Sequence, residues 1–384
     1  MNTIKNKKIA IVGGGPGGLT LARLLQMNGL NVTVYERDAS RHARAQGATL
    51  DLHEESGLNA LQHAGLMDAF RANYRPGADR LRVVNKNAEI VFDDHENSDR
   101  ETSRPEIDRG PLQQILLDSL APGTVIWDSH FVSLSPQDNS WKLDFKNGIF
   151  AFADIVIAAD GANSKLRPYV TPLKAFYCGY TAVEGAVYHS EVASPKIHEL
   201  LRGGKIFAME DEKSLIVSSK GDGSLMFYTC GQHEESWVRD SRIDFSDKAQ
   251  VRAWFQQEYA DWDEVWRELF ENAASSYTPR PLYCMPLDQT WEAAPNLTLL
   301  GDAAHLMPPF AGEGVNMAML DALELSQCLL DENYPSTQSA IAAYEKQMLA
   351  RSSDVAEQSL SATIAFHTPD AISFMLGVMG QSEP

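Results

Sequence analysis

A cluster of glycines near the start of the chain could hold the pyrophosphate of a dinucleotide. It follows the apolar, β-branched run 8–12 and has the GxGxxG spacing, whose key positions are Gly13, Gly15, Pro16 and Gly18. The first glycine permits a tight turn, the second lets the backbone approach a phosphate, and the third lets a helix pack against the strand. The pyrophosphate would then lie at the N-terminus of that helix. A bare glycine turn is the alternative interpretation.

Glu36 favours the dinucleotide interpretation. It lies eighteen residues after Gly18, at the end of the next apolar run, 32–35. A carboxylate at this position can accept hydrogen bonds from both ribose hydroxyls of an adenosine. The motif does not choose between FAD and NAD, but Glu36 disfavours the 2′-phosphate of NADP at this place.

A second segment places an aspartate directly after a predicted buried strand, 154–159. Asp160 and Gly161 end this strand, and Ser164 and Arg167 follow at fixed offsets. Asp160 is therefore a candidate cofactor ligand. The alternative is purely structural, a strand and an Asp-Gly turn followed by a helix start that Ser164 caps.

A third segment repeats this arrangement late in the chain. The apolar run 297–300 leads into Gly301 and Asp302, whose carboxylate could bind a hydroxyl of a ribityl chain. A rigid Pro-Pro pair then precedes a Gly-Glu-Gly loop, 312–314, that opens a helix. The free N–H groups of that helix start could stabilise the negative charge of a reduced flavin. A plain loop before a helix is the alternative, and His305 is assigned no role because such residues more often pack or hydrogen-bond.

The hydrophobic pattern around these motifs predicts an α/β protein in two units. The first 36 residues have a β-α-β pattern, and residues 172–285 carry short alternating runs that indicate an antiparallel sheet. We expect the aromatic residues of this second region to be core residues more often than a binding surface. The remaining expected elements are a helix at 105–120, a hairpin at 141–152 around Asn147-Gly148, helical segments at about 247–271, a long amphipathic helix at 338–366 and a short apolar tail at 370–379.

These patterns divide the chain into a discontinuous nucleotide-binding unit with an inserted sheet. We predict a FAD-binding domain from residues 1–75, 101–171 and 286–335, a substrate-binding domain from 76–100 and 172–285, and a C-terminal bridging helix from 336–384.

Composition narrows the possible partners. The 384 residues carry a formal net charge of −19, which disfavours nucleic acid and anionic membrane surfaces because both would repel the chain. We find no metal-ligand cluster, no apolar run long enough to span a bilayer and no secretory signal. The four cysteines are scattered without a CxxC pair, so we expect them to be reduced, in a cytoplasmic protein.

The three motifs, in this order, resemble those of the class A flavoprotein monooxygenases, the para-hydroxybenzoate hydroxylase superfamily, over essentially the whole chain. Within this superfamily, the chain resembles the tetracycline-inactivating monooxygenases of the Tet(X) kind more specifically. The stretches that carry this closer likeness are 34–38, 48–53, 105–109, 124–128 and 301–316. The resemblance implies a Rossmann-like FAD-binding domain of the GR2 type, an inserted, mainly antiparallel substrate sheet, a long C-terminal helix and a monomeric protein.

Matched by position, the resemblance implies specific FAD contacts. Glu36 and Arg37 would hold the adenosine, Arg44 and Asp51 would lie near the isoalloxazine, and Arg109 would lie near the pyrophosphate or ribityl chain. Asp302 would bind the ribityl chain, and the segment 309–316 would face the polar edge of the ring. The full set of expected cofactor-binding residues is Gly13, Gly15, Pro16, Gly18, Glu36, Arg37, Arg44, Asp51, Arg109, Asp160, Asp302, Pro309, Gly312, Gly314, Val315 and Asn316.

The expected substrate side departs from the family. Phe310 and Gly312 would line it, but Glu184 and Lys205 stand where the Tet(X) kind has a glutamine and an arginine that hold tetracycline, and Met226 replaces a histidine. The first change adds a charge, and the second loses a bidentate fork. Flavin binding therefore carries over well, and tetracycline specificity carries over poorly.

The resemblance also implies a reaction. NADPH or NADH would reduce FAD, and a flavin C4a-hydroperoxide formed with O2 would hydroxylate an aromatic or polycyclic small molecule, tetracycline included. Since the cofactor carries this chemistry, we assign no catalytic side chain. Another flavin reaction, on a phenolic metabolite, is the first alternative, and a non-catalytic flavin redox sensor is the second. A plain NAD dehydrogenase would not need the two later aspartate motifs, and the Trp-x-Trp-x-Ile-Pro stretch of flavin halogenases does not occur.

Overall fold

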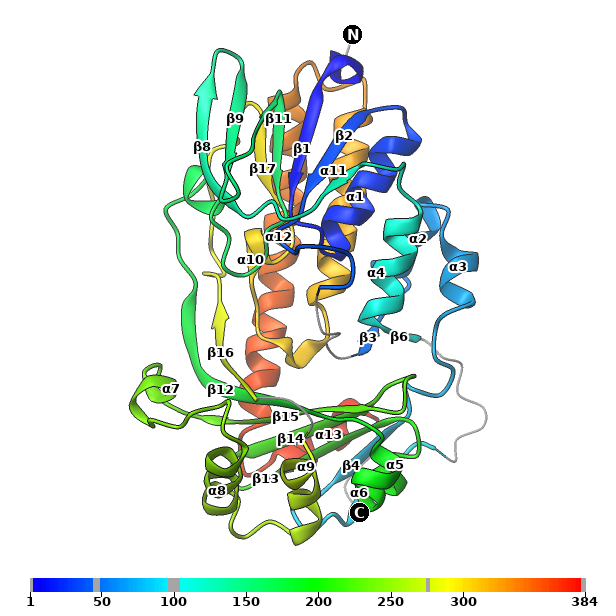
Figure 1. Ribbon diagram of the computed structural model, residues 1–384, viewed down its shortest axis with the longest axis vertical. Helices are drawn as coiled ribbons and strands as arrows, with labels where there is room; N and C mark the ends of the chain where they lie inside the picture. Colours follow the sequence, from blue (N-terminus) through cyan, green and yellow to red (C-terminus); the bar gives the residue numbers. More distant parts are fainter. Residues whose placement is uncertain (1–2, 44–48, 96–103, 274–276, 381–384) are drawn as a thin grey trace.

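The computed structural model describes residues 3–43, 49–95, 104–273 and 277–380, and within these ranges the strands form four sheets (Figure 1). The first is a parallel sheet in the order β17-β11-β1-β2-β7. Its strands are β1 (Lys8–Val12), β2 (Asn31–Tyr35), β7 (Val125–Ile126), β11 (Ile155–Ala158) and β17 (Leu297–Leu299). Most of their residues are apolar and buried, as expected for a parallel sheet covered on both faces. Because the strands share one direction, their carboxyl ends meet at one edge.

Helices pack closely around this sheet. Along α1, Gly17 approaches α11 so tightly that a Cβ at Gly17 would lie 2.7 Å from the carbonyl oxygen of Ala318. Near the N-terminus, η1 (Thr3–Asn6) precedes β1. The helices of this part are α1 (Pro16–Met27), α2 (Gly57–His63), α3 (Met67–Arg71), α4 (Arg109–Asp118), α10 (Asp302–His305) and α11 (Gly314–Leu330).

Two small antiparallel sheets flank the parallel sheet. The hairpin expected around Asn147-Gly148 is confirmed, since β9 (Ser140–Phe145) pairs with β10 (Phe150–Ala153), and β8 (Phe131–Gln137) completes a three-stranded sheet. The other sheet pairs β3 (Thr49–Asp51) with β6 (Glu106–Asp108).

The seven-stranded sheet has the order β16-β12-β15-β14-β13-β4-β5. Its neighbouring strands are antiparallel except for β13 and β4, so the expectation of a mainly antiparallel inserted sheet is confirmed. The strands are β4 (Leu81–Val84), β5 (Ile90–Asp93), β12 (Phe176–Val187), β13 (Lys205–Glu210), β14 (Lys213–Ser219), β15 (Leu225–Gln232) and β16 (Thr278–Cys284).

Aromatic side chains fill the core on one face of this sheet. Phe227 of β15, Phe255, Trp266 and Phe270 are buried there, which agrees with the expectation that these aromatic residues are core. Figure 1 shows α6, α8 and α9 on the side of the sheet that faces away from the parallel sheet. The short helices of this region are α5 (Ser190–Ala193), α6 (Pro195–Leu201), α7 (Trp237–Asp240), α8 (Lys248–Glu258), η3 (Glu264–Trp266) and α9 (Arg267–Glu271).

The long C-terminal helix α12 (Thr337–Ala365) runs from the parallel sheet to the seven-stranded sheet (Figure 1). It starts with a capping box in which Ser336 and Ser339 bond to each other's backbone N–H groups. A further helix, α13 (Ala371–Val378), then packs against β13 and β4. The expected tail is therefore helical, with Met375 buried in the contact.

Two expectations about local structure were wrong in detail. The stretch 105–120 is not one helix, because Glu106–Asp108 form the short strand β6 before α4 begins at Arg109. The stretch 247–271 is divided into α8, η3 and α9. Among the described residues, no helix is long and apolar enough to cross a bilayer, and no group of three His, Cys, Asp or Glu side chains is arranged to hold a metal ion.

Candidate active site

The glycine loop joins β1 to α1 with the geometry that its spacing predicts. Gly13 has a φ of +114°, and a Cβ there would overlap the carbonyl oxygen of Ala159. A Cβ at Gly18 would overlap the backbone oxygen of Gly13, so α1 packs directly on the loop. At Gly15, by contrast, no atom lies within 4 Å of where a Cβ would stand. Gly15 is the N-cap of α1, with Pro16 in its first turn, so the open space lies at a helix N-terminus suited to a phosphate.

Glu36 follows β2 and points its carboxylate at this loop. Oε2 accepts a hydrogen bond from the N–H of Gly14 at 2.6 Å, and Oε1 accepts one from the N–H of Asp38 at 2.9 Å. The side chain is only 4% exposed, which fixes its orientation. A carboxylate can accept about four hydrogen bonds, so acceptor capacity remains for ribose hydroxyls. Arg37, the next residue, is exposed.

The two later aspartates lie at the same edge of the sheet. Asp160 follows β11, and its Oδ2 accepts a hydrogen bond from the N–H of Lys165 at 2.8 Å. Asp302 follows β17. Arg167 joins the two motifs, because its guanidinium donates to the carbonyl oxygens of Asp302 and Ala303, both at 2.7 Å. Burial raises the pKa of Asp302, and the charges of His305, Arg109 and Arg167 oppose this shift.

His305 has a structural role. Its Nε2 lies 2.6 Å from Oδ2 of Asp321 on α11, and the same oxygen accepts the N–H of Gly301 at 2.8 Å. Arg351 of α12 donates to the other oxygen of Asp321 at 2.6 Å. This buried network ties α12 and α11 to the Gly301–Asp302 turn and so positions the Asp302 backbone.

The turn between η4 (Pro309–Ala311) and α11 approaches β3 closely. Gly312 has a φ of +73°, and a Cβ there would lie 3.3 Å from the Asp51 carboxylate. Asn316 is fully buried, and its Nδ2 donates to the carbonyl oxygens of Asp51 and Gly312, at 2.9 and 3.3 Å. Its Oδ1 accepts the N–H of His53 at 3.0 Å. The side chain of Asn316 thus holds the turn in place, and only its backbone remains to face a ligand.

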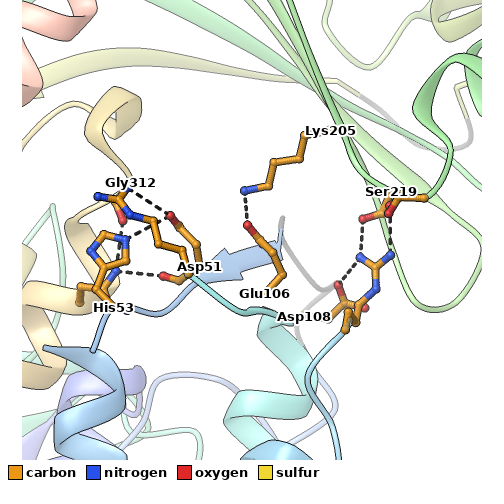
Figure 2. A network of polar contacts seen from close by, with 11 residues as sticks. Asp51, His53, Glu106, Asp108, Lys205, Ser219 and Gly312 are labelled. Atoms are coloured by element: carbon orange, nitrogen blue, oxygen red, sulfur yellow. Dashed lines mark hydrogen bonds and ion pairs between the residues drawn. The ribbon is translucent and has the colours of Figure 1, made fainter. Parts of the chain in front are cut away.

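A buried histidine lies between two carboxylates at this turn. His53 is 2% exposed, with Nε2 at 3.2 Å from Asp51 and Nδ1 at 3.2 Å from Glu313 (Figure 2). Although burial lowers it, the hydrogen bonds with the two carboxylates raise the pKa of His53 to about 9. The side chain is therefore positively charged at neutral pH. Arg104 lies 3.9 Å from the same Asp51 oxygen.

The strand β6 connects this turn to the seven-stranded sheet. Glu106 pairs across the strands with Asp51 and forms an ion pair with Lys205 of β13 (Figure 2). Two residues along, Asp108 accepts the backbone N–H of Gly221 at 2.9 Å and lies 3.5 Å from Arg75. Burial raises the pKa of Glu106, which is 1% exposed, and the charge of Lys205 opposes this shift.

Three of the five residues expected to contact substrate, namely Glu184, Lys205 and Met226, share one face of the seven-stranded sheet. Alternating positions of a strand share a face, and the strand registers place Glu184 opposite Tyr228, Met226 opposite Ser218 and Lys205 opposite Ser218. This is the face that Lys205 uses to reach Glu106. Met226 is buried on this face, with 6% of it exposed.

Glu184 is paired with an arginine and a tyrosine. The Arg280 guanidinium donates to Glu184 at 2.5 Å, and Tyr228 lies opposite Glu184 across the β12–β15 pair. Burial, and then the charge of Glu184, raise the pKa of Tyr228, while the charges of Arg280 and Arg109 oppose the shift.

Phe310 supplies an aromatic surface beside these groups. The centroid of its ring lies 5.2 Å from the ring centroids of both Phe366 and His367, which directly follow α12. His367 is 5% exposed, and its Nε2 lies 3.0 Å from the Ser214 hydroxyl of β14. Burial lowers the pKa of His367 to about 4, so its imidazole is neutral near pH 7.

Within the described residues, most of the expected cofactor-binding residues therefore lie along the carboxyl edge of the parallel sheet. Arg44 lies outside the described residues. Sequence reasoning missed four polar groups beside them, namely His53, Glu106, Tyr228 and Arg280. The alternation of Glu106 and Asp108 was the one local signal that could have pointed to a strand with both carboxylates on the same side.

Comparisons with known proteins place the whole arrangement in one family. The family described as FAD binding domain matches residues 6–359. A relative, the 3-amino-4-hydroxybenzoate 2-monooxygenase of Streptomyces cremeus, is 28% identical over 371 residues, which cover 94% of this chain and 88% of the relative.

Solved structures agree in fold. An FAD-containing monooxygenase from Photorhabdus luminescens superimposes with a TM-score of 0.77 at 25% identity, covering 94% of this chain and 99% of that one. The tetracycline destructase Tet(55) also gives a TM-score of 0.77, over 99% of this chain and 97% of its own, and its 19% identity shows likeness of fold alone.

Proposed function

Because the chain belongs to the FAD binding domain family and is a flavin-dependent monooxygenase, we propose that it hydroxylates an aromatic or polycyclic compound with O2 and NADPH or NADH. The observation that carries the proposal is the meeting of three ligand-binding features at one edge of the parallel sheet. These are the open N-terminus of α1 at Gly15, the aspartate after β17 and the Gly312 turn, which lies against Asp51 of β3.

FAD fits the residues that are present. The space at Gly15 suits a pyrophosphate, Glu36 retains acceptors for a ribose, and Asp302 is partly exposed next to Gly314 of α11. The first-turn N–H groups of α11 have no side-chain cap, so they are available to an acceptor on the ring. The proposed FAD contacts are Gly13, Gly15, Pro16, Gly18, Glu36, Arg37, Arg44, Asp51, Arg109, Asp160, Asp302, Pro309, Gly312, Gly314, Val315 and Asn316.

Bound FAD would supply the redox chemistry that activates O2 and inserts one oxygen atom into the substrate. The protein would orient the two reactants and stabilise charge. In this proposal the α11 N-terminus faces the polar edge of the ring, since N–H groups there stabilise negative charge. Arg109, whose charge acts on both Asp302 and Tyr228, would hold the cofactor beside the substrate.

The substrate would lie against Glu184, Lys205, Met226, Phe310 and Gly312. Met226 and Phe310 offer an apolar surface to rings, while Lys205 and Arg280 are cations whose charge Glu106 and Glu184 already balance. An acidic oxygen on the substrate, a phenol or enol for example, would compete with Glu106 for the Lys205 ammonium. This arrangement favours a ring compound with a polar, acidic edge, a class that includes both tetracycline and 3-amino-4-hydroxybenzoate.

We propose the same division of the chain that the sequence predicts. Residues 1–75, 101–171 and 286–335 would bind FAD, residues 76–100 and 172–285 would bind substrate, and residues 336–384 would bridge the two. We also propose that the enzyme works as a monomer in the cytoplasm and that NADPH or NADH binds only transiently.

The test is to incubate the purified protein with FAD, NADPH and air, and to add either tetracycline or 3-amino-4-hydroxybenzoate. We expect flavin to remain bound after gel filtration and one compound to accelerate NADPH oxidation and gain one oxygen by mass spectrometry. Flavin that is lost on gel filtration would contradict the cofactor site. Tight flavin with no NADPH consumption in the presence of any ring compound would favour a redox sensor.

A further inference from the structure

His53 is held by contacts from two separate parts of the chain. Its imidazole bridges Asp51, at the end of β3, and Glu313, the residue before α11, with both contacts at 3.2 Å (Figure 2 shows the Asp51 side). The imidazole is 2% exposed and the two carboxylates 21% and 16%, so solvent screens these charges less than it would at the surface. A protonated imidazole carries an N–H on each ring nitrogen, so Nε2 can donate to Asp51 while the positive charge faces Glu313 as an ion pair.

The contact with His53 keeps the Glu313 side chain from capping the helix that follows it. Glu313 is the N-cap residue of α11, a 17-residue helix, and its side chain makes no capping hydrogen bond. Free N–H groups and the helix dipole attract a carboxylate at such a position. In this structure His53 holds the carboxylate of Glu313 instead, which leaves the first-turn N–H groups of Gly314 and Val315 uncapped by it.

The path of the turn does not itself depend on the imidazole. Asn316 bonds to the carbonyl oxygens of Asp51 and Gly312 and to the backbone N–H of His53. Gly57 of α2 packs so near that a Cβ there would lie 2.5 Å from Oδ1 of Asn316. These contacts would survive a change of the His53 side chain. The effect of the imidazole on Glu313 can therefore be separated from folding of the turn.

We propose that His53 is a positioning residue that keeps the Glu313 carboxylate away from the N-terminus of α11, so that the N–H groups of this helix remain available to FAD. The inference rests on the proposed function, because it requires the flavin ring to lie at this helix start. Without the imidazole, the Glu313 carboxylate would cap α11 and repel the negative charge that develops on a reduced flavin. It would also face Asp51 without a shared cation.

Charged groups on the neighbouring elements also act on His53 and its two carboxylate partners. Asp51 and Glu313 contact His53 directly, Arg104 lies 3.9 Å from Asp51, and the charge of Lys205 also acts on Asp51. Glu106 faces Asp51 across the β3–β6 pair and is itself paired with Lys205. The two carboxylates that contact His53 therefore share it as their common cation.

The experiment measures FAD affinity and flavin reduction potential for the full-length protein and for His53→Gln, Glu313→Gln and the double variant. FAD binding is followed by quenching of flavin fluorescence, and the potential by titration against a redox dye. We expect His53→Gln to weaken FAD binding about tenfold and to make the potential more negative. Glu313→Gln in the same chain should restore both values to within about twofold of the wild-type affinity, and Glu313→Gln alone should change little.

The double variant distinguishes a role of His53 in positioning Glu313 from a role in packing the turn alone. If His53 served only to pack the turn, removing the Glu313 charge would not restore binding, and that result would overturn the inference. Unchanged FAD affinity in His53→Gln would overturn it too. If the wild-type protein bound no FAD at all, the proposed function would fail first, so the two failures are distinguishable.

Discussion

The ammonium of Lys205 and the carboxylate of Glu106 form an ion pair that joins β13 of the seven-stranded sheet to β6 beside the parallel sheet (Figure 2). Glu106 is 1% exposed, so this is a mostly buried charge pair and not a surface contact. The pair links the expected substrate face to the Gly312 turn, because Glu106 also lies opposite Asp51 in the β3–β6 sheet.

Removal of Lys205 should therefore destabilise the fold. In Lys205→Met, Glu106 would remain buried without its cation, at a cost of about 3 kcal/mol in the free energy of unfolding at pH 8. Because burial raises the pKa of Glu106 above its unfolded value, protonation favours the folded state, and the deficit should shrink as the pH falls. Urea unfolding at several pH values measures this.

A matched control is Lys213→Met, since Lys213 of β14 lies 3.9 Å from Glu258, whose side chain is 38% exposed where that of Glu106 is 1% exposed. We expect that variant to lose less than about 1 kcal/mol, with little dependence on pH. Equal losses in the two variants would argue against a buried Lys205–Glu106 pair.

The affinity for FAD should depend on pH through His53. Its raised pKa means that the contact with Glu313 is fully present below pH 6.5, the usual pKa, and is lost as the pH rises through about 9. The dissociation constant of FAD should therefore stay level in neutral buffer and rise as the pH passes about 9. His53→Gln should lack this rise, and an identical pH profile in that variant would assign the transition to another group.

Asp302→Ala should weaken FAD binding. The proposed bond from a ribityl hydroxyl to the carboxylate is charge-assisted, so its loss should raise the dissociation constant by about tenfold or more. Flavin content after gel filtration and fluorescence titration measure the effect. Asp68→Ala, at a fully exposed aspartate on α3, is the matched control and should retain full flavin content.

Gly15→Val should remove FAD without unfolding the protein. No protein atom lies within 4 Å of the added Cβ, so the valine would occupy only the space proposed for the pyrophosphate. Gly18→Val provides the contrast, because its side chain would overlap the backbone of Gly13 and should lower the melting temperature strongly. Normal flavin loading in Gly15→Val would remove the basis for placing the pyrophosphate there.

Local sequence patterns predicted the parts of the site that lie in one continuous segment. The β1–α1–β2 unit, with Gly13, Gly15 and Glu36 at its strand ends, follows from apolar periodicity and glycine spacing. The same holds for Asp302, since it follows a short apolar strand that pairs in parallel with β11.

Contacts between distant segments were not predictable in this way. His53 and Asn316 are 263 residues apart, and no local pattern signals that one holds the other. Glu106 was assigned to a helix because the three-residue strand β6 directly precedes α4, whose apolar periodicity masks it. Its partner Lys205 was expected to face the substrate, and the structure adds that Glu106 already neutralises it.

The central claim, that one atom of O2 enters a ring compound, is tested most directly by isotope labelling. The protein, FAD, NADPH and either 3-amino-4-hydroxybenzoate or tetracycline would be incubated under oxygen-18 gas in ordinary water, and the product weighed by mass spectrometry. The account predicts one oxygen-18 atom in each product molecule, and none when the label is instead in the water. A product that takes its new oxygen from water, or NADPH oxidation that yields only hydrogen peroxide with every ring compound tried, would contradict it.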